Sequence, residues 1–151
     1  KGVITLTSAP DLSYKATINA NAVTTADYTT EAPVTVENPG VAAPWAVQAQ
    51  LGNFTGTNGT LGDTKITVAS GSDNNITSND MTLQAGGAAQ PFAASAKTDT
   101  GFTGVGTTSI NGLATKISIA AGNVAGTYTA PLTWTLSATP SDDSTTPESN
   151  N

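Results

Sequence analysis

The sequence Leu132-Thr133-Trp134-Thr135-Leu136-Ser137, near the end of the 151-residue chain, decides the fold class. Apolar side chains occupy every second position, and threonine or serine fills the positions between them. Successive side chains of a β-strand point to opposite faces, so this alternation predicts a strand with one buried face. The segment Trp45–Leu51 alternates in the same way, with alanine or glutamine at the intervening positions. Both tryptophans of the chain therefore lie in predicted half-buried strands.

The rest of the chain reads as further short strands separated by turns. Weaker or shorter alternation predicts strands at residues 1–8, 14–19, 33–37, 65–69, 81–84, 91–96 and 113–120. Glycine, proline and asparagine punctuate the sequence between these segments, as they do in turns. This pattern predicts an all-β fold, an antiparallel β-sandwich of Greek-key or immunoglobulin-like topology. Residues 20–30 are expected to be a connection, and residues 53–63 and 98–112 long loops rich in Gly, Thr and Asn.

Length and composition predict one domain followed by a polar tail. A chain of 151 residues corresponds to a single domain as a starting expectation. Residues 141–151 contain only Ser, Asp, Thr, Pro, Glu and Asn, a composition that cannot form a hydrophobic core. We therefore predict a β-sandwich domain over residues 1–140 and a disordered tail or linker over residues 141–151.

The composition excludes several classes of function. Cysteine and histidine are absent, which removes disulfides, thiol nucleophiles, the usual general base and the commonest zinc ligands. Eleven Asp and Glu against five Lys and no Arg give a net charge of -6, which disfavours binding to nucleic acid or anionic lipid. No apolar run approaches the roughly 20 residues that a membrane-spanning helix requires, so no membrane insertion is expected.

Three kinds of chemical site are weighed from the residues alone. The carboxylates lie on separate loops, so no acid pair for glycoside hydrolysis is indicated, and we predict no enzyme, catalytic residue or cofactor. The loop over residues 71–80 is rich in oxygen donors but lacks the ligand spacing of a calcium-binding loop. A solvated turn is the default there, and a Ca²⁺ site stays open. An isopeptide bond from Lys65 or Lys116 to an asparagine also stays open, because both lysines lie on predicted strands.

The two tryptophan segments also carry a resemblance to a known family. The segment from Tyr128 to Pro140, with its core Leu-Thr-Trp-Thr-Leu-Ser followed by Ala-Thr-Pro, resembles the distal motif of the WxL domain, a cell-surface module of Gram-positive bacteria. A second segment resembles the proximal motif of the same domain. This segment is Pro44-Trp45-Ala46-Val47, followed by Gln50, Leu51 and Phe54. This chain carries Val47 where leucine is usual in the family. The resemblance extends from residue 4 to residue 140.

The resemblance implies a non-catalytic domain that holds its parent protein on the cell wall by binding peptidoglycan, and that associates with a WxL-interacting protein. The implied location is the extracellular, wall-associated surface of a Gram-positive bacterium. In the alternative, the domain is a protein-protein interaction module, and the partner supplies wall attachment. The motif match points to four binding residues: Trp45, Val47, Trp134 and Leu136. The strand pattern equally allows both indoles to be core, and the two interpretations stay open.

Overall fold

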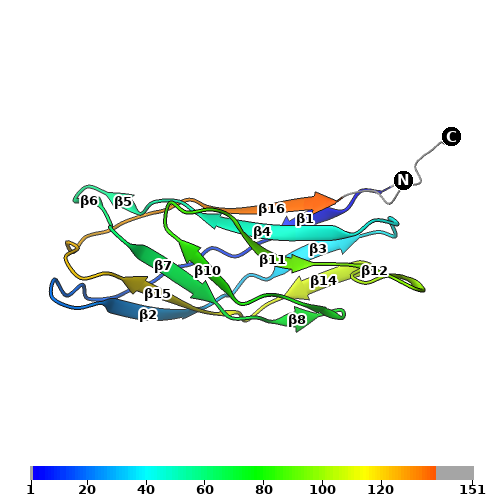
Figure 1. Ribbon diagram of the computed structural model, residues 1–151, viewed down its shortest axis with the longest axis horizontal. Coiled ribbons are helices and arrows are strands. Elements are labelled where there is room, and N and C mark those ends of the chain that lie inside the picture. Colours follow the sequence, from blue (N-terminus) through cyan, green and yellow to red (C-terminus); the bar gives the residue numbers. More distant parts are fainter. Residues whose placement is uncertain (1, 139–151) are drawn as a thin grey trace.

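The computed structural model describes residues 2–138, and within this range the chain is antiparallel β-structure with no helix (Figure 1). The predicted all-β antiparallel class is confirmed. Because no helix occurs in this range, none is present there that could cross a membrane. The strands are β1 (Thr5–Ser8), β2 (Thr24–Thr29), β3 (Val34–Asn38), β4 (Trp45–Leu51), β5 (Thr55–Gly56), β6 (Gly59–Thr60), β7 (Thr64–Val68), β8 (Ser72–Asp73), β9 (Ile76–Thr77), β10 (Met81–Gln84), β11 (Gln90–Ala94), β12 (Lys97–Thr98), β13 (Gly101–Phe102), β14 (Gly106–Ile110), β15 (Ala114–Ile119) and β16 (Leu132–Ala138).

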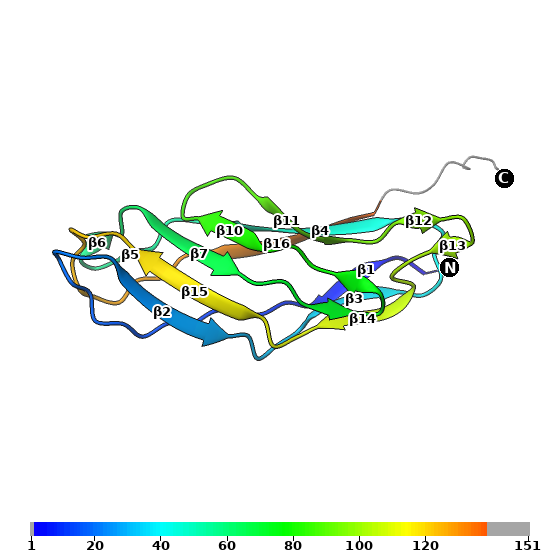
Figure 2. The same cartoon turned by 60° about the horizontal axis from the view of Figure 1, so that its bottom comes forward.

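Three larger sheets build the body, in the orders β11-β4-β16, β10-β7-β15-β2 and β1-β3-β14. The last two follow one another along the molecule, because β2 leads into β3 and β14 leads into β15 (Figure 2). Thr30 holds this junction: its N–H donates to Leu113 O at 2.9 Å, and its hydroxyl accepts the Leu113 N–H at 2.8 Å. The sheet β11-β4-β16 faces the other two sheets in a sandwich-like arrangement. The Greek-key or immunoglobulin-like topology stays a prediction.

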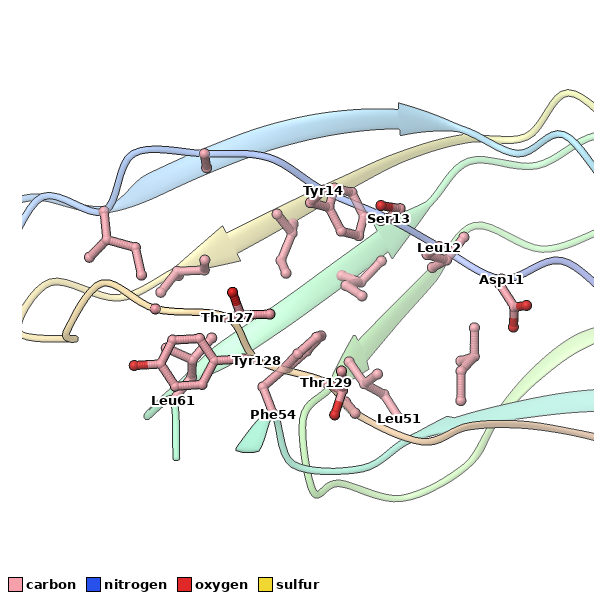
Figure 3. Close-up of a pocket in the computed structure, with 18 residues that line it drawn as sticks. Asp11, Leu12, Ser13, Tyr14, Leu51, Phe54, Leu61, Thr127, Tyr128 and Thr129 are labelled. Atoms are coloured by element: carbon pink, nitrogen blue, oxygen red, sulfur yellow. The ribbon is translucent and has the colours of Figure 1, made fainter. Parts of the chain in front are cut away.

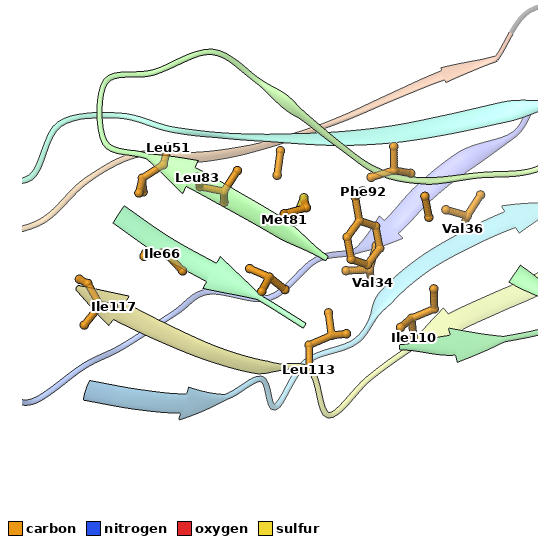
Figure 4. Packing of buried hydrophobic residues seen from close by; sticks show 14 of the residues in the cluster. Val34, Val36, Leu51, Ile66, Met81, Leu83, Phe92, Ile110, Leu113 and Ile117 are labelled. Atoms are coloured by element: carbon orange, nitrogen blue, oxygen red, sulfur yellow. The ribbon is translucent and has the colours of Figure 1, made fainter. Parts of the chain in front are cut away.

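The hydrophobic core fills the space between the sheets (Figure 4). Phe92 from β11 lies at its centre, fully buried, with aliphatic side chains from the facing sheets around it. Buried and exposed positions alternate without exception along β4 and β7, as the sequence pattern predicts. In β15 the same alternation buries Thr115, Ile117 and Ile119. Burying one face of each strand removes apolar surface from water, which is the main stabilising term of such a fold.

Two predictions about the N-terminal third are wrong. Residues 14–19 form no strand, and the segment expected to be a connection contains β2, a six-residue strand paired with β15. The inward positions of β2 are occupied by Thr24, Ala26 and Tyr28. Thr24 and Ala26 give little apolar contrast with Thr25 and Thr29 on the outer side. Pairing with β15 therefore determines this strand more than its own pattern does.

The two expected long loops are largely β-hairpins and strands. Residues 53–63 contain the hairpin β5–β6, which turns at Thr57-Asn58; Gly59, which follows the turn, has a φ of 114°. Residues 98–112 contain β13 and the five-residue strand β14, which pairs with β3 along its whole length. The predicted tail over residues 141–151 lies outside the described residues, as do the last two positions of the predicted domain.

Candidate functional site

The two tryptophan segments are neighbouring strands of one sheet. β4 lies between β11 and β16, and it pairs with β16 along all seven residues. In this antiparallel register Trp134 lies opposite Ala49, and Leu136 lies opposite Val47. The chain thus brings together two segments that are more than eighty positions apart in sequence.

Trp45 is a core residue. Its side chain is only 2% exposed, and its indole N–H donates to the backbone oxygen of Gly104 at 3.1 Å. Gly104 has a φ of +67°, and a Cβ there would lie 2.9 Å from the indole ring. Glycine therefore meets both demands of this position, the left-handed backbone and the close approach of the ring. Val47 is 1% exposed, so neither of these predicted binding residues offers its side chain to a ligand in this conformation.

Trp134 and Leu136 are half-buried on the inner face of β16. The indole of Trp134 meets the ring of Phe92 edge-on, with the ring centroids 5.3 Å apart. Its N–H donates to Pro10 O at 3.3 Å, which ties β16 to the irregular segment between β1 and β2. The structure thus gives all four predicted residues a packing role. Trp45 and Val47 are fully buried, and Trp134 and Leu136 are half-buried. Whether Trp134 or Leu136 also contacts a ligand stays a prediction.

The opposite side of the same two strands is a polar surface, which we call the outer motif face. On it Gln48 lies opposite Thr135 and Gln50 opposite Thr133, and all four side chains are exposed. Ala46 and Ser137 complete the pair of strands, so the face carries amide and hydroxyl groups without a charge. The motif match draws attention to the apolar positions and misses this face, although the alternation in the sequence already marks it.

A second feature is a cavity of about 470 Å³ on one side of the molecule, which we call the side groove (Figure 3). It lies between the irregular residues 11–18 and the segment 126–132 that leads into β16. Aliphatic side chains such as Leu61, Ile66 and Ile119 form its floor, and the rings of Tyr14 and Tyr128 lie among its lining residues. Its size falls in the usual range for ligand pockets. Its lining comes from distant segments, so no local sequence pattern reveals it.

Tyr14 is the titratable group of the groove with a shifted pKa. Burial of the phenol raises the pKa of Tyr14 above its usual value, and the hydrogen bond with the Thr115 hydroxyl opposes this rise. The ring of Tyr14 also packs edge-on against Tyr28, with centroids 5.9 Å apart. These contacts fix the segment of residues 11–18 against the sheet that contains β15.

The oxygen-rich loop over residues 71–80 is a hairpin whose carboxylates are already engaged. Asp73 accepts the N–H of Ser109 at 2.8 Å, and Asp80 accepts the N–H of Ser70 at 2.9 Å. Across residues 2–138 no three side chains of the types His, Cys, Asp and Glu come together as metal ligands. Both carboxylates accept backbone N–H groups, as in a solvated turn, and the Ca²⁺ site stays an open hypothesis.

The two lysines considered for an isopeptide bond are exposed on their strands. The amine of Lys116 lies 3.6 Å from the carboxylate of Asp27, and more than half of each side chain is exposed. An ion pair in such a position contributes little to stability. An isopeptide bond from either lysine stays a hypothesis.

The fold and these surfaces can be set beside known proteins. No family model matches the chain, no curated protein matches it, and no solved structure matches it. The resemblance to the WxL domain therefore stays a prediction based on the two tryptophan segments.

Proposed function

We propose that this protein is a non-catalytic binding domain that holds its parent protein non-covalently on the Gram-positive cell wall by attaching to peptidoglycan. One observation carries the proposal: the two segments that resemble the WxL motifs pair strand to strand along β4 and β16. Two motifs that serve one function are expected to lie together in one structural unit. If the two matches were due to chance, there would be no reason for the segments to be neighbours in the fold. The proposal extends to WxL family membership and to an extracellular, wall-associated location.

The outer motif face is the surface we assign to the wall. Its amides and hydroxyls, on Gln48, Thr133 and Thr135, can exchange hydrogen bonds with sugar hydroxyls and peptide amides. The amide nitrogen of Gln50 donates to Gly87 O at 3.0 Å, so this side chain offers mainly its oxygen. Paired strands fix the backbone beneath these side chains before binding, so little backbone conformational entropy is lost on contact. The face is uncharged while the whole chain carries -6, so attraction to a wall rich in anionic polymers has to be short-range.

A pull-down on purified peptidoglycan, without any second protein, tests this assignment. The double substitution Gln48→Glu and Thr135→Glu places two like charges on the outer motif face, and we expect it to weaken binding roughly tenfold or more. The matched control is Thr67→Glu with Thr82→Glu, an exposed cross-strand pair on the sheet that contains β7 and β10. Equal binding by both variants would contradict the assignment, and so would failure of the unmodified protein to bind.

Salt dependence tests the short-range character of the attraction. Because long-range repulsion opposes the approach of an acidic domain to the wall, screening should leave binding unchanged or strengthen it between low and physiological salt. A steep loss of binding with added salt would show that charge attraction carries the contact, against the proposal.

A second candidate function is a protein-protein interaction module, with the partner attached to the wall. The observation that favours it is the open edge of β16, which pairs with β4 on one side only. Unpaired strand edges are templates for another chain. Binding to peptidoglycan only when a WxL-interacting protein is present would favour this second function over the first.

A further inference from the structure

The segment that leads into β16 presents an unpaired backbone edge to the side groove. Pro131 O accepts the N–H of Gly52 at 2.8 Å, and Thr129 exchanges two hydrogen bonds with Thr55 at 2.8 and 2.9 Å. Backbone groups of successive residues in a strand point in opposite directions. The residues that alternate with Thr129 and Pro131 therefore direct their backbone groups away from β4 and β5. These residues are Tyr128, Ala130 and Leu132.

The other wall of the groove also lacks a strand partner. Residues 11–18 make no backbone-to-backbone hydrogen bond with any part of the chain that the structure describes. Side chains hold them instead: the Tyr14 hydroxyl bonds to Thr115, and Leu12 and Ile18 pack against the core. The sequence of residues 14–19 reads as a strand, yet no ladder forms there. The groove thus separates two backbone segments, neither of which is paired with a neighbour on its groove side.

We propose that the side groove binds an extended segment of a partner protein, which pairs as an added strand with the edge formed by residues 128–132. This inference rests on the second candidate function and specifies its site. In strand addition, main-chain hydrogen bonds supply affinity and pockets for alternate side chains supply specificity. The floor formed by Leu61, Ile66 and Ile119 accepts small or aliphatic side chains at every second position of the added strand.

Charge further defines the partner segment. Asp11 is the one charged side chain among the residues that line the groove, and the whole chain carries -6. A segment with Lys or Arg near Asp11 complements this charge, whereas an acidic segment is repelled.

Selection from a displayed library of random dodecapeptides on the folded protein tests the partner chemistry. We expect the enriched peptides to carry apolar residues at alternate positions and Lys or Arg toward one end. The exposed Asp11 can be changed without disturbing the core, and Asp11→Lys should shift the terminal preference to Asp or Glu. No enrichment, or a consensus that Asp11→Lys leaves unchanged, would overturn the proposal.

Proline substitutions test the edge itself. Ala130→Pro removes an open N–H and places a ring in the path of the added strand, and proline is tolerated at such edges. Affinity for the selected peptide should fall roughly tenfold or more. The control is Thr25→Pro on the edge strand β2. The N–H of Thr30 bonds to Leu113 O, and N–H directions alternate along a strand, so the N–H groups of odd-numbered residues in β2 face away from β15. Proline at position 25 therefore removes no hydrogen bond of the sheet. Equal peptide binding by the two variants would contradict strand addition at residues 128–132.

Amide hydrogen exchange provides a test that needs no substitution. Adding the selected peptide to the unmodified protein should slow exchange at Tyr128, Ala130 and Leu132, and leave Thr129 and Thr133 unchanged because these already bond within the protein. Protection without this alternation would overturn the proposal, and so would displacement of the peptide by soluble peptidoglycan fragments. The wall pull-down is run in parallel. Wall binding without peptide binding refutes only the strand addition, and peptide binding without wall binding refutes only the wall attachment.

Discussion

Replacing each tryptophan with alanine separates the packing roles of the two motif strands. Trp45 is 2% exposed and hydrogen-bonded to Gly104, so Trp45→Ala should lower the free energy of unfolding by about 3–5 kcal/mol. Trp134 is more exposed than Trp45 but still packs on Phe92, so Trp134→Ala should cost less, about 2–3 kcal/mol. For a domain of this size the first loss corresponds to a fall in Tm of roughly 10–15 °C, and the second to a fall of roughly 6–9 °C.

Urea unfolding followed by far-ultraviolet circular dichroism measures both losses on one scale. A change in midpoint at constant slope reports stability alone. Equal costs for the two substitutions, or a larger cost at Trp134, would refute the burial argument. The same samples should then be tested on peptidoglycan. A stable Trp134→Ala protein that no longer binds the wall would show that the indole of Trp134 contacts the ligand and is more than a packing residue.

Three further substitutions test individual contacts. Gly104→Ala forces a left-handed backbone on alanine and a Cβ against Trp45, so it should cost at least about 1–3 kcal/mol, measured as a fall in Tm. Thr30→Val leaves the buried N–H of Leu113 without its side-chain acceptor and should cost roughly 1–3 kcal/mol in urea unfolding. The pKa of Tyr14 is raised by burial, so its contribution to stability is complete below pH 10 and falls as the pH rises above that value. Tyr14→Phe should therefore lessen the alkaline loss of stability, read from urea midpoints measured across that range.

Strong alternation made the central strands predictable. In Trp45–Leu51 and Leu132–Ala138 apolar residues alternate with polar residues or alanine, so the sequence alone identifies the strand and its buried face. The partner of each strand is not encoded locally. The register that places Trp134 opposite Ala49 depends on contacts between segments far apart in the chain, which no single segment specifies.

The strand predictions were wrong where side chains are buried without backbone pairing, and where the backbone is paired without a clear apolar pattern. Tyr14 and Ile18 turn inward as in a strand, but their backbone finds no ladder, so the pattern reports burial only. β2 shows the reverse, because its threonines pair well with β15 while giving little hydrophobic contrast. The side groove escapes prediction for a related reason. It is formed by the space between segments, and a linear pattern does not describe that space.

The pairing of β4 with β16 has a mechanical consequence. The chain continues beyond Ala138 from the end of β16, so tension applied to that continuation acts along the strand. The hydrogen bonds to β4 lie across this direction, and the seven register pairs would share the load in shear instead of opening one after another. A domain held on a surface through its outer motif face would thus resist pulling through the strand that also forms part of that face.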